Sequence, residues 1–291
     1  MTTHQNGCED VARWRGTIDQ TLTAISGGFG ARSGPLGAAM AEAALARGKR
    51  FRGTLILLAG AATGEVCPTL VDIACALELA HTASLVFDDL PCMDNASTRR
   101  GQATTHVAHG EARAILAGIA LVTESLNLLA VTPGAEPATR ARLVAILAGA
   151  LGPAGLCAGQ DLDLHAPKSP DGVVREHDLK TGALFAAGFE MFAVFRGLPA
   201  GQTAALIELG LLLGRVFQSY DDLLDVMEDG DAAAARPRRG LLAANTASRA
   251  AAHYNRLREQ LYSALSDCPF DAAPLAWYTA TVLPDVAPRA A

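Results

Sequence analysis

An acidic cluster ends a long apolar stretch near residue 90. Asp88, Asp89 and Asp94 belong to the sequence DDLPCMD. His81 precedes Asp88 by seven residues, which places both side chains on one face of a helix. Because proline disfavours the helical conformation of the residue before it, Pro91 is expected to turn the chain and bring Asp94 back toward the pair. Clustered carboxylates suit Mg²⁺, which bridges them to phosphates. Taken alone, the cluster equally fits a solvated helix end whose acids cap the next helix.

A second acidic cluster lies 130 residues further on, in the sequence QSYDDLLD at 218–225. Asp221 and Asp225 are four residues apart, so they share a helix face, and Gln218 lies one turn before Asp222. The preceding segment LIELGLLLGRVF is strongly apolar, so these acids are embedded and not scattered along a charged surface. Two such clusters in one helical protein predict two metal-binding walls with a diphosphate between them. An acidic helix terminus is the weaker alternative once both clusters are considered.

Positive charges gather at a few places in the chain. Residues 48–52 read GKRFR, Arg99-Arg100 follow the first acidic cluster, and lysine occurs only at 49, 168 and 180. Arginine binds phosphate through two parallel hydrogen bonds, whereas lysine acts as a point charge. A Walker loop is excluded, because position 43 is alanine and Arg50 follows the lysine. The alternative for GKRFR is a basic surface turn.

Helical periodicity dominates the segments that must position these residues. In 70–89, for example, apolar residues recur at 70, 73, 74 and 77. Helices are predicted over 36–47, 70–89, 110–130, 138–151, 176–196, 202–229 and 246–266. No stretch alternates apolar and polar residues, so no strand is predicted. No linker separates two cores, and the sequence predicts one all-α domain over 1–291. Residues 1–12 are expected to be frayed, and 267–291 to be peripheral.

Composition narrows the class of protein. The 291 residues are 50% hydrophobic and 19% charged, which supplies a core and excludes a disordered chain. Aromatic residues are 5% and the net charge is -6, which argues against nucleic-acid binding. The six cysteines include no C-x-x-C pair and are interpreted as reduced thiols of a cytoplasmic protein. The uncharged run 143–160 is interrupted by glycine and Pro153, so no membrane span is expected.

Five motifs in order resemble the trans-isoprenyl diphosphate synthases. They are GKRFR, HTASLVFDDLPCMDNASTRRG, GLCAGQDLDL, LKTGALF and FQSYDDLLD, and they span about residues 36–229. The bacterial geranylgeranyl diphosphate synthases are the most similar subgroup. The resemblance implies a single helical bundle of the isoprenoid synthase type around a deep central cavity. It also implies a homodimer that condenses isopentenyl diphosphate with an allylic diphosphate, using two to three Mg²⁺ ions, with Mn²⁺ as a possible substitute.

The resemblance further implies a role for each matching residue. The main magnesium ligands would be Asp88, Asp94 and Asp221, supported by Asp89, Asp222 and Asp225. The diphosphate of isopentenyl diphosphate would be bound by Lys49, Arg52, His81 and Arg100. The allylic substrate would be contacted by Arg99, Lys180, Thr181 and Gln218. Such a site needs no Ser–His or His–Asp pair, since the departing diphosphate is thought to act as the base.

Two departures from the family pattern leave alternatives open. Gly53 stands where relatives usually have proline. In the loop after the second acidic cluster, Asp231 follows Gly230 where relatives carry lysine, and the second lysine position is matched by Arg239. This loop leaves open a catalytically weak subunit that regulates another synthase. A class I terpene cyclase is opposed by Asp225, which stands where the cyclase motif needs serine or threonine.

Product length depends on the helix before the first acidic cluster. Ala83 lies five residues before Asp88, or about 7.5 Å along a helix. Helix angle alone does not place its side chain in a channel. The family resemblance supplies that step, because small residues there are typical of geranylgeranyl producers and aromatic ones of farnesyl producers. With Ala83 followed by Ser84, a C20 product is expected, and a farnesyl diphosphate synthase is the alternative.

Overall fold

The computed structural model describes residues 2–166, 170–229 and 247–286, and these are almost entirely helical. The chain falls into two compact units, Met1–Ala148 and Gly149–Ala291. The all-α prediction is confirmed. The described residues also contain a two-residue hairpin, in which β1 (Thr98–Arg99) pairs antiparallel with β2 (Gln102–Ala103). The expectation of no strand is wrong there, because strands this short show no alternation in sequence.

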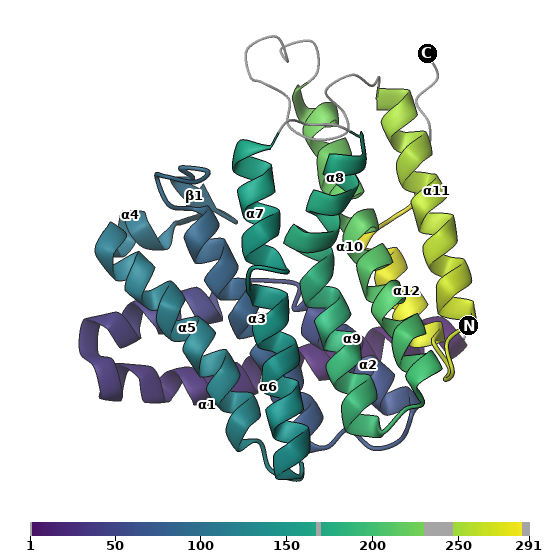
Figure 1. Ribbon diagram of the computed structural model, residues 1–291, viewed down its shortest axis with the longest axis horizontal. Helices are drawn as coiled ribbons and strands as arrows, with labels where there is room; N and C mark the ends of the chain where they lie inside the picture. Colours follow the sequence, from purple (N-terminus) through teal and green to yellow (C-terminus); the bar gives the residue numbers. More distant parts are fainter. Residues whose placement is uncertain (1, 167–169, 230–246, 287–291) are drawn as a thin grey trace. The chain divides into compact units, whose positions relative to one another are not determined.

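The first unit is built around α3 (Pro68–Asp88), which packs against α1 (Thr2–Leu45), α2 (Phe51–Ala62) and α5 (Glu111–Val131) (Figure 1). The remaining helices of this unit are α4 (Thr105–His109) and α6 (Pro137–Leu151). Helix α3 is apolar on all sides and largely buried, as expected of a helix surrounded by others. It ends at Asp88, so the first acidic cluster lies at the end of a largely buried helix.

Helix α1 is sharply bent near its C-terminal third. Gly34 has φ +52°, a conformation that glycine adopts without a steric penalty, and Pro35 follows it. A Cβ at Gly37 would lie 2.1 Å from the carbonyl oxygen of Phe29, so only glycine fits this close approach. The bend separates the N-terminal part of α1 from the residues 36–45 that lead into the basic segment.

The second unit contains α7 (Leu156–His165), α8 (Pro170–His177) and α9 (Ala183–Arg196). Its longest helix is α10 (Ala200–Asp229), and α11 (Ala247–Ser266) and α12 (Ala273–Val282) complete it. The predicted helix 176–196 is therefore divided. A π-helical turn, η1 (Asp178–Gly182), joins α8 to α9 and carries Lys180 and Thr181.

Both chain ends depart from expectation. Helix α1 begins at Thr2, and Val11 and Trp14 are already buried, so residues 2–12 lie in a helix where fraying was expected. At the other end, α12 buries Leu275 and Tyr278, so residues 273–283 are packed and not peripheral. Pro274 lies in the first turn of α12, where proline is favoured, so this proline accompanies a helix start and does not mark the end of packed structure.

Among the described residues, four helical stretches are long and apolar enough to cross a membrane, judged by length and composition only. They are Pro68–Asp88, Glu111–Val131, Pro137–His165 and Ala200–Leu224. For α3 the apolar composition is accounted for by burial among its neighbours in the first unit. The expectation of no membrane span stays a prediction.

Candidate functional site

The first acidic cluster is formed by a tight turn at the end of α3. The backbone N–H of Asp94 donates to the carbonyl oxygen of Asp88 at 2.9 Å, so the chain reverses as Pro91 predicts. Asp89 is buried, Asp88 is half-buried and Asp94 is exposed. Within seven residues, the three carboxyl groups therefore differ in burial, from the interior of the unit to its surface.

Arg99 belongs to this acidic cluster. Its Nε donates to Asp89 Oδ1 at 2.8 Å and to Oδ2 at 3.0 Å, and its Nη2 lies 2.7 Å from Oδ1. Burial by itself would lower the pKa of Arg99, but the hydrogen bond to Asp89 and the charges of Asp88 and Asp94 outweigh it and raise the pKa. The hairpin strand β1 thus places one fixed positive charge against the acids.

Arg100, the next residue, turns to a different group. It has φ +53°, and its Nη1 donates to the carbonyl oxygen of Arg47 at 2.7 Å. A Cβ at Gly48 would lie 2.8 Å from this nitrogen, so the glycine of GKRFR makes room for it. The positive φ of Arg100 and of Gly101 at the hairpin turn therefore directs two adjacent arginines to two different clusters.

Arg52, Arg100 and His81 form a basic cluster in the first unit. Burial, followed by the charges of Arg52 and Arg100, lowers the pKa of His81 well below its ordinary value of 6.5. Arg52 is buried, whereas Lys49 is exposed. A neutral His81 can donate a hydrogen bond to an anion without adding charge. The structure thus brings together three of the four residues that the resemblance assigned to isopentenyl diphosphate, and the fourth, Lys49, lies in the segment that carries Arg52.

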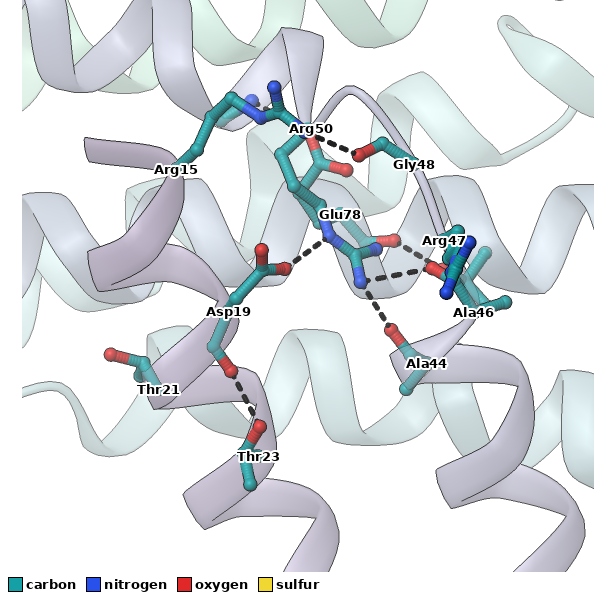
Figure 2. A network of polar contacts seen from close by, with 12 residues as sticks. Arg15, Asp19, Thr21, Thr23, Ala44, Ala46, Arg47, Gly48, Arg50 and Glu78 are labelled. Carbon is teal, nitrogen blue, oxygen red and sulfur yellow. Dashed lines mark hydrogen bonds and ion pairs between the residues drawn. The ribbon is translucent and has the colours of Figure 1, made fainter. Parts of the chain in front are cut away.

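Arg50 has a structural role that the sequence did not indicate. Its backbone is left-handed, at φ +48°, and its side chain is buried. Nε donates to Asp19 Oδ1 at 2.8 Å, while Nη2 donates to the carbonyl oxygens of Ala44 and Ala46, each at 3.1 Å (Figure 2). These bonds fix the end of α1 to the start of α2. Arg50 therefore holds the segment that carries Lys49 and Arg52.

Glu78 is a second residue that sequence reasoning missed. It is buried, and its Oε1 accepts a hydrogen bond from the backbone N–H of Gly53 at 2.9 Å. Burial raises the pKa of Glu78, opposed by this hydrogen bond and by the charges of Arg52, Arg50 and Arg100. The available signal was an acidic residue inside an apolar helix, three positions before His81.

The same contact explains the glycine found where relatives have proline. Proline has no N–H and could not donate to Glu78. A Cβ at Gly53 would also lie 2.9 Å from Ile18 Cδ1 and 3.0 Å from the carbonyl oxygen of Ala74. Gly53 therefore lets α2 approach α3 closely, beneath the basic cluster.

In the second unit, polar side chains form a continuous relay between η1 and α10. The hydroxyl of Thr181 donates to Gln218 Oε1 at 3.1 Å, and Gln218 Nε2 donates to Asp222 Oδ1 at 3.3 Å. His177 Nε2 lies 3.7 Å from Asp222 Oδ2. Three predicted site residues are therefore in contact, and His177 joins them as a residue that the sequence did not single out.

Lys180 is held from another direction. Its Nζ lies 2.6 Å from Asp163 Oδ2 on α7, in the motif GLCAGQDLDL. In the same motif Gln160 is buried, and its side-chain amide has no hydrogen-bond partner among the described residues. Native proteins seldom leave a buried amide unsatisfied, so Gln160 is a candidate ligand-contacting residue. Asp163 and Gln160 were visible in the motif but were given no role from the sequence.

Several predicted residues are placed only in part. Asp221 is half-buried on α10, and Asp225 belongs to the same helix, but its side chain lies outside the described residues, as does all of Arg239. Ala83 is 0% exposed and Ser84 8%, and the Ser84 hydroxyl donates to the carbonyl oxygen of His81 at 2.8 Å.

The donor set fits Mg²⁺ delivered together with a diphosphate. No group of three or more His, Cys, Asp or Glu side chains in the described part of the chain is arranged to hold a metal ion alone. Magnesium commonly uses one or two carboxylates and completes its shell with substrate phosphates and water. The half-buried Asp88 and the exposed Asp94 supply oxygen ligands of that kind, without the sulfur or nitrogen that favours softer metals.

Comparisons with known proteins identify the family of the chain. A profile described as polyprenyl synthetase matches residues 35–236. A geranylgeranyl diphosphate synthase from Pseudescherichia vulneris is 43% identical over 193 residues, which are 64% of this chain and 62% of that protein. A farnesyl diphosphate synthase from Geobacillus stearothermophilus is 39% identical over 193 residues, 65% of each chain. The chain thus spans less than two thirds of the length of these curated relatives.

Solved structures extend the likeness to nearly the whole fold. A geranyltransferase from Legionella pneumophila superposes with a TM-score of 0.87 at 27% identity, over 97% of this chain and 98% of that one. A helical bundle of the isoprenoid synthase type is therefore confirmed. Since the family profile covers most of the chain and includes both acidic clusters, the protein belongs to the polyprenyl synthetase family.

Proposed function

We propose that the protein is a geranylgeranyl diphosphate synthase, a prenyltransferase that joins isopentenyl diphosphate head-to-tail to an allylic diphosphate in the trans configuration. The observation that carries the proposal is the division of adjacent arginines in the first unit. Arg99 is bound to the acidic cluster, while Arg100 joins the basic cluster around His81. Two neighbouring anion-binding groups suit an enzyme with two diphosphate substrates, whereas a cyclase handles one.

The chemistry follows from where the charges lie. Mg²⁺, when bound, supplies positive charge that stabilises the diphosphate as it leaves the allylic substrate. Asp88, Asp94 and Asp221 would hold it, with Asp89, Asp222 and Asp225 in support. Mn²⁺ has similar ligand preferences and is expected to substitute.

Cationic side chains add fixed positive charge at the departing allylic diphosphate. Lys180 and Arg99 would neutralise it, and Arg239 is proposed to act with them from the loop after the second acidic cluster. Lys49, Arg52, Arg100 and neutral His81 would bind the second diphosphate and orient the double bond of isopentenyl diphosphate. That double bond attacks the allylic carbon as its C–O bond breaks, and the departing diphosphate takes up the proton that is then lost.

Turnover by the purified chain alone tests the proposal. Incubation with Mg²⁺, isopentenyl diphosphate and farnesyl diphosphate should give a C20 diphosphate, identified by mass spectrometry. Asp88→Asn is the matched inactive control. A C15 product from geranyl diphosphate that is not extended would identify a farnesyl diphosphate synthase. Hydrocarbon with free diphosphate would identify a cyclase. No product alone, with stimulation of another synthase, would identify a regulatory subunit.

We further propose a cytoplasmic homodimer. Ile115, Leu116 and Ile119 form an exposed apolar patch on α5, with exposed fractions of 42%, 54% and 54%. An exposed patch of large apolar side chains of this kind suits an interface between two chains. All six cysteines are free of disulfides, as a reducing compartment would keep them. Light scattering after gel filtration should give twice the mass of 30.1 kDa, and Ile119→Asp should return it to the single value.

A further inference from the structure

The π turn η1 is an unusual element in an otherwise α-helical unit. It spans Asp178–Gly182 and contains both Lys180 and Thr181. π turns are rare and occur mostly as single turns within α-helices, frequently at functional sites. The contacts that hold η1 therefore decide where the ammonium of Lys180 and the hydroxyl of Thr181 point.

A two-pronged ion pair ties the first residue of η1 to α10. Arg215 Nε donates to Asp178 Oδ1 at 2.5 Å, and Nη2 donates to Oδ2 at 2.7 Å. This fork-to-fork geometry fixes orientation as well as distance. Arg215 lies three residues, or nearly one helical turn, before Gln218, the residue that accepts the hydrogen bond of Thr181. Both contacts therefore join η1 to the same stretch of α10.

The backbone on both sides of η1 is fitted to this position. A Cβ at Gly214, next to Arg215, would lie 2.3 Å from Gly182 Cα. A Cβ at Gly159 on α7 would lie 2.2 Å from the backbone nitrogen of Lys180. The glycines permit close approach but do not by themselves fix the register of the turn along α10. The ion pair of Arg215 with Asp178 is directional and supplies that register.

We propose that Arg215 and Asp178 are positioning residues, whose ion pair holds η1 in register with α10 so that Lys180 and Thr181 meet the allylic diphosphate. The inference rests on the proposed function. The two side chains are 32% and 22% exposed, so the pair adds little to global stability, as is usual for ion pairs in contact with solvent. Its effect is expected in substrate kinetics and not in folding.

Steady-state kinetics with each substrate varied in turn tests the pair. Arg215→Gln and Asp178→Asn should each lower kcat/KM for the allylic diphosphate roughly tenfold, the scale of coupling between residues in direct contact. KM for isopentenyl diphosphate should change less than twofold. The double variant should be no worse than either single variant. Arg215→Lys keeps the charge but loses the fork, so it should recover activity only in part.

Arg258→Gln is the matched control, since it breaks a different ion pair of the same unit, with Asp285. It should leave both kinetic parameters unchanged. Equal losses toward both substrates, or additive losses in the double variant, would overturn the positioning role.

Hydrogen exchange of the backbone amides tests, independently of activity, whether the ion pair of Arg215 with Asp178 holds η1 in place. In Arg215→Gln the amides of 178–182 should exchange about tenfold faster than in the Arg258→Gln control, since the turn loses one of its side-chain anchors. Unchanged exchange would show that the ion pair does not hold η1, even if the enzyme is active. If the unmodified protein makes no prenyl product, the proposed function fails, and the exchange result still decides whether the pair fixes η1.

Discussion

The two units fix their anion-binding residues by different means. In the first unit, arginines are held by charged or carbonyl acceptors, as Arg50 is by Asp19 and Arg99 is by Asp89. In the second unit, Lys180 also has a carboxylate partner, Asp163, but the relay from Thr181 to Asp222 runs through the neutral amide of Gln218. Planar guanidinium groups with two or three acceptors have little freedom, whereas hydroxyls and amides can exchange partners. The arginine side chains of the first unit are thus held in place before substrate binds. The position of Thr181 in the second unit depends instead on the backbone geometry of η1.

The largest effect is expected at the acidic clusters, one of which lies in each unit. Asp88→Ala in the first unit or Asp221→Ala in the second should lower kcat at least about 100-fold, the scale of removing one preorganised electrostatic stabiliser. Activity should also disappear in excess EDTA and return with added Mg²⁺. Full turnover in EDTA would refute the metal site, and a large loss in only one variant would mean that the two clusters are not equivalent.

The basic segment separates structural from substrate-binding charge within two residues. Arg50→Ala removes a buried clamp and should lower the free energy of unfolding by about 2 kcal/mol, as loss of a buried polar network does. Lys49→Ala should change it by less than about 0.5 kcal/mol, because Lys49 is exposed. Urea unfolding measures both.

In substrate kinetics, the direct effect on isopentenyl diphosphate binding should come from Lys49→Ala. Lys49→Ala should raise KM for isopentenyl diphosphate roughly tenfold, with a smaller change for the allylic substrate. A destabilised Lys49→Ala variant or an unaffected Arg50→Ala variant would contradict the assignment of roles within GKRFR.

A smaller effect should appear in the pH dependence of stability. The pKa of His81 in the folded protein is lowered, first by burial and then by the nearby arginines, so the unfolded chain binds its proton more readily. Stability is therefore lost as pH falls through the unfolded value of 6.5 toward the folded pKa. Between pH 7.5 and pH 5.5, the unfolding free energy of the native protein should fall more steeply than that of His81→Gln. Parallel curves would mean that His81 is not held neutral by the basic cluster.

The features that could be predicted from the sequence are those that depend on residues close together in the chain. The turn at Pro91, the acidic ends of α3 and α10 and the helical class all follow from spacing and from preferences of single residues. Contacts across long separations were not predictable in this way. Arg50 meets Asp19 over 31 residues and Arg215 meets Asp178 over 37, and no periodicity indicates such partners. The same holds for η1, whose sequence DLKTG carries no signal that distinguishes a π turn from an α-helix.

Substitutions at Ala83 and Ser84, on the helix before Asp88, are expected to have the smallest effect on rate but to change the product. Ser84 lies four residues before Asp88, about 40° away around the helix, whereas Ala83 is about 140° away. Ser84 is 8% exposed and Ala83 is 0% exposed, so a large side chain at 83 has to displace its neighbours. Both Ala83→Tyr and Ser84→Tyr should shorten the main product from C20 to C15, because the added ring blocks the growing chain and leaves the acidic clusters unchanged.

The two variants should differ in stability. Ala83→Tyr should lower the melting temperature more than Ser84→Tyr, since overpacking a closed core position typically costs about 1–3 kcal/mol. Thr82→Tyr is the matched control on the same helix and should keep the C20 product, because residue 82 is half-buried and lies about 160° around the helix from Ser84. Mass spectrometry of the products decides the matter. If both variants still make mainly C20, product length is set by other residues. If Ser84→Tyr alone shortens the product, the wall of the channel lies on the face of α3 that carries Asp88, and the role assigned to Ala83 is wrong.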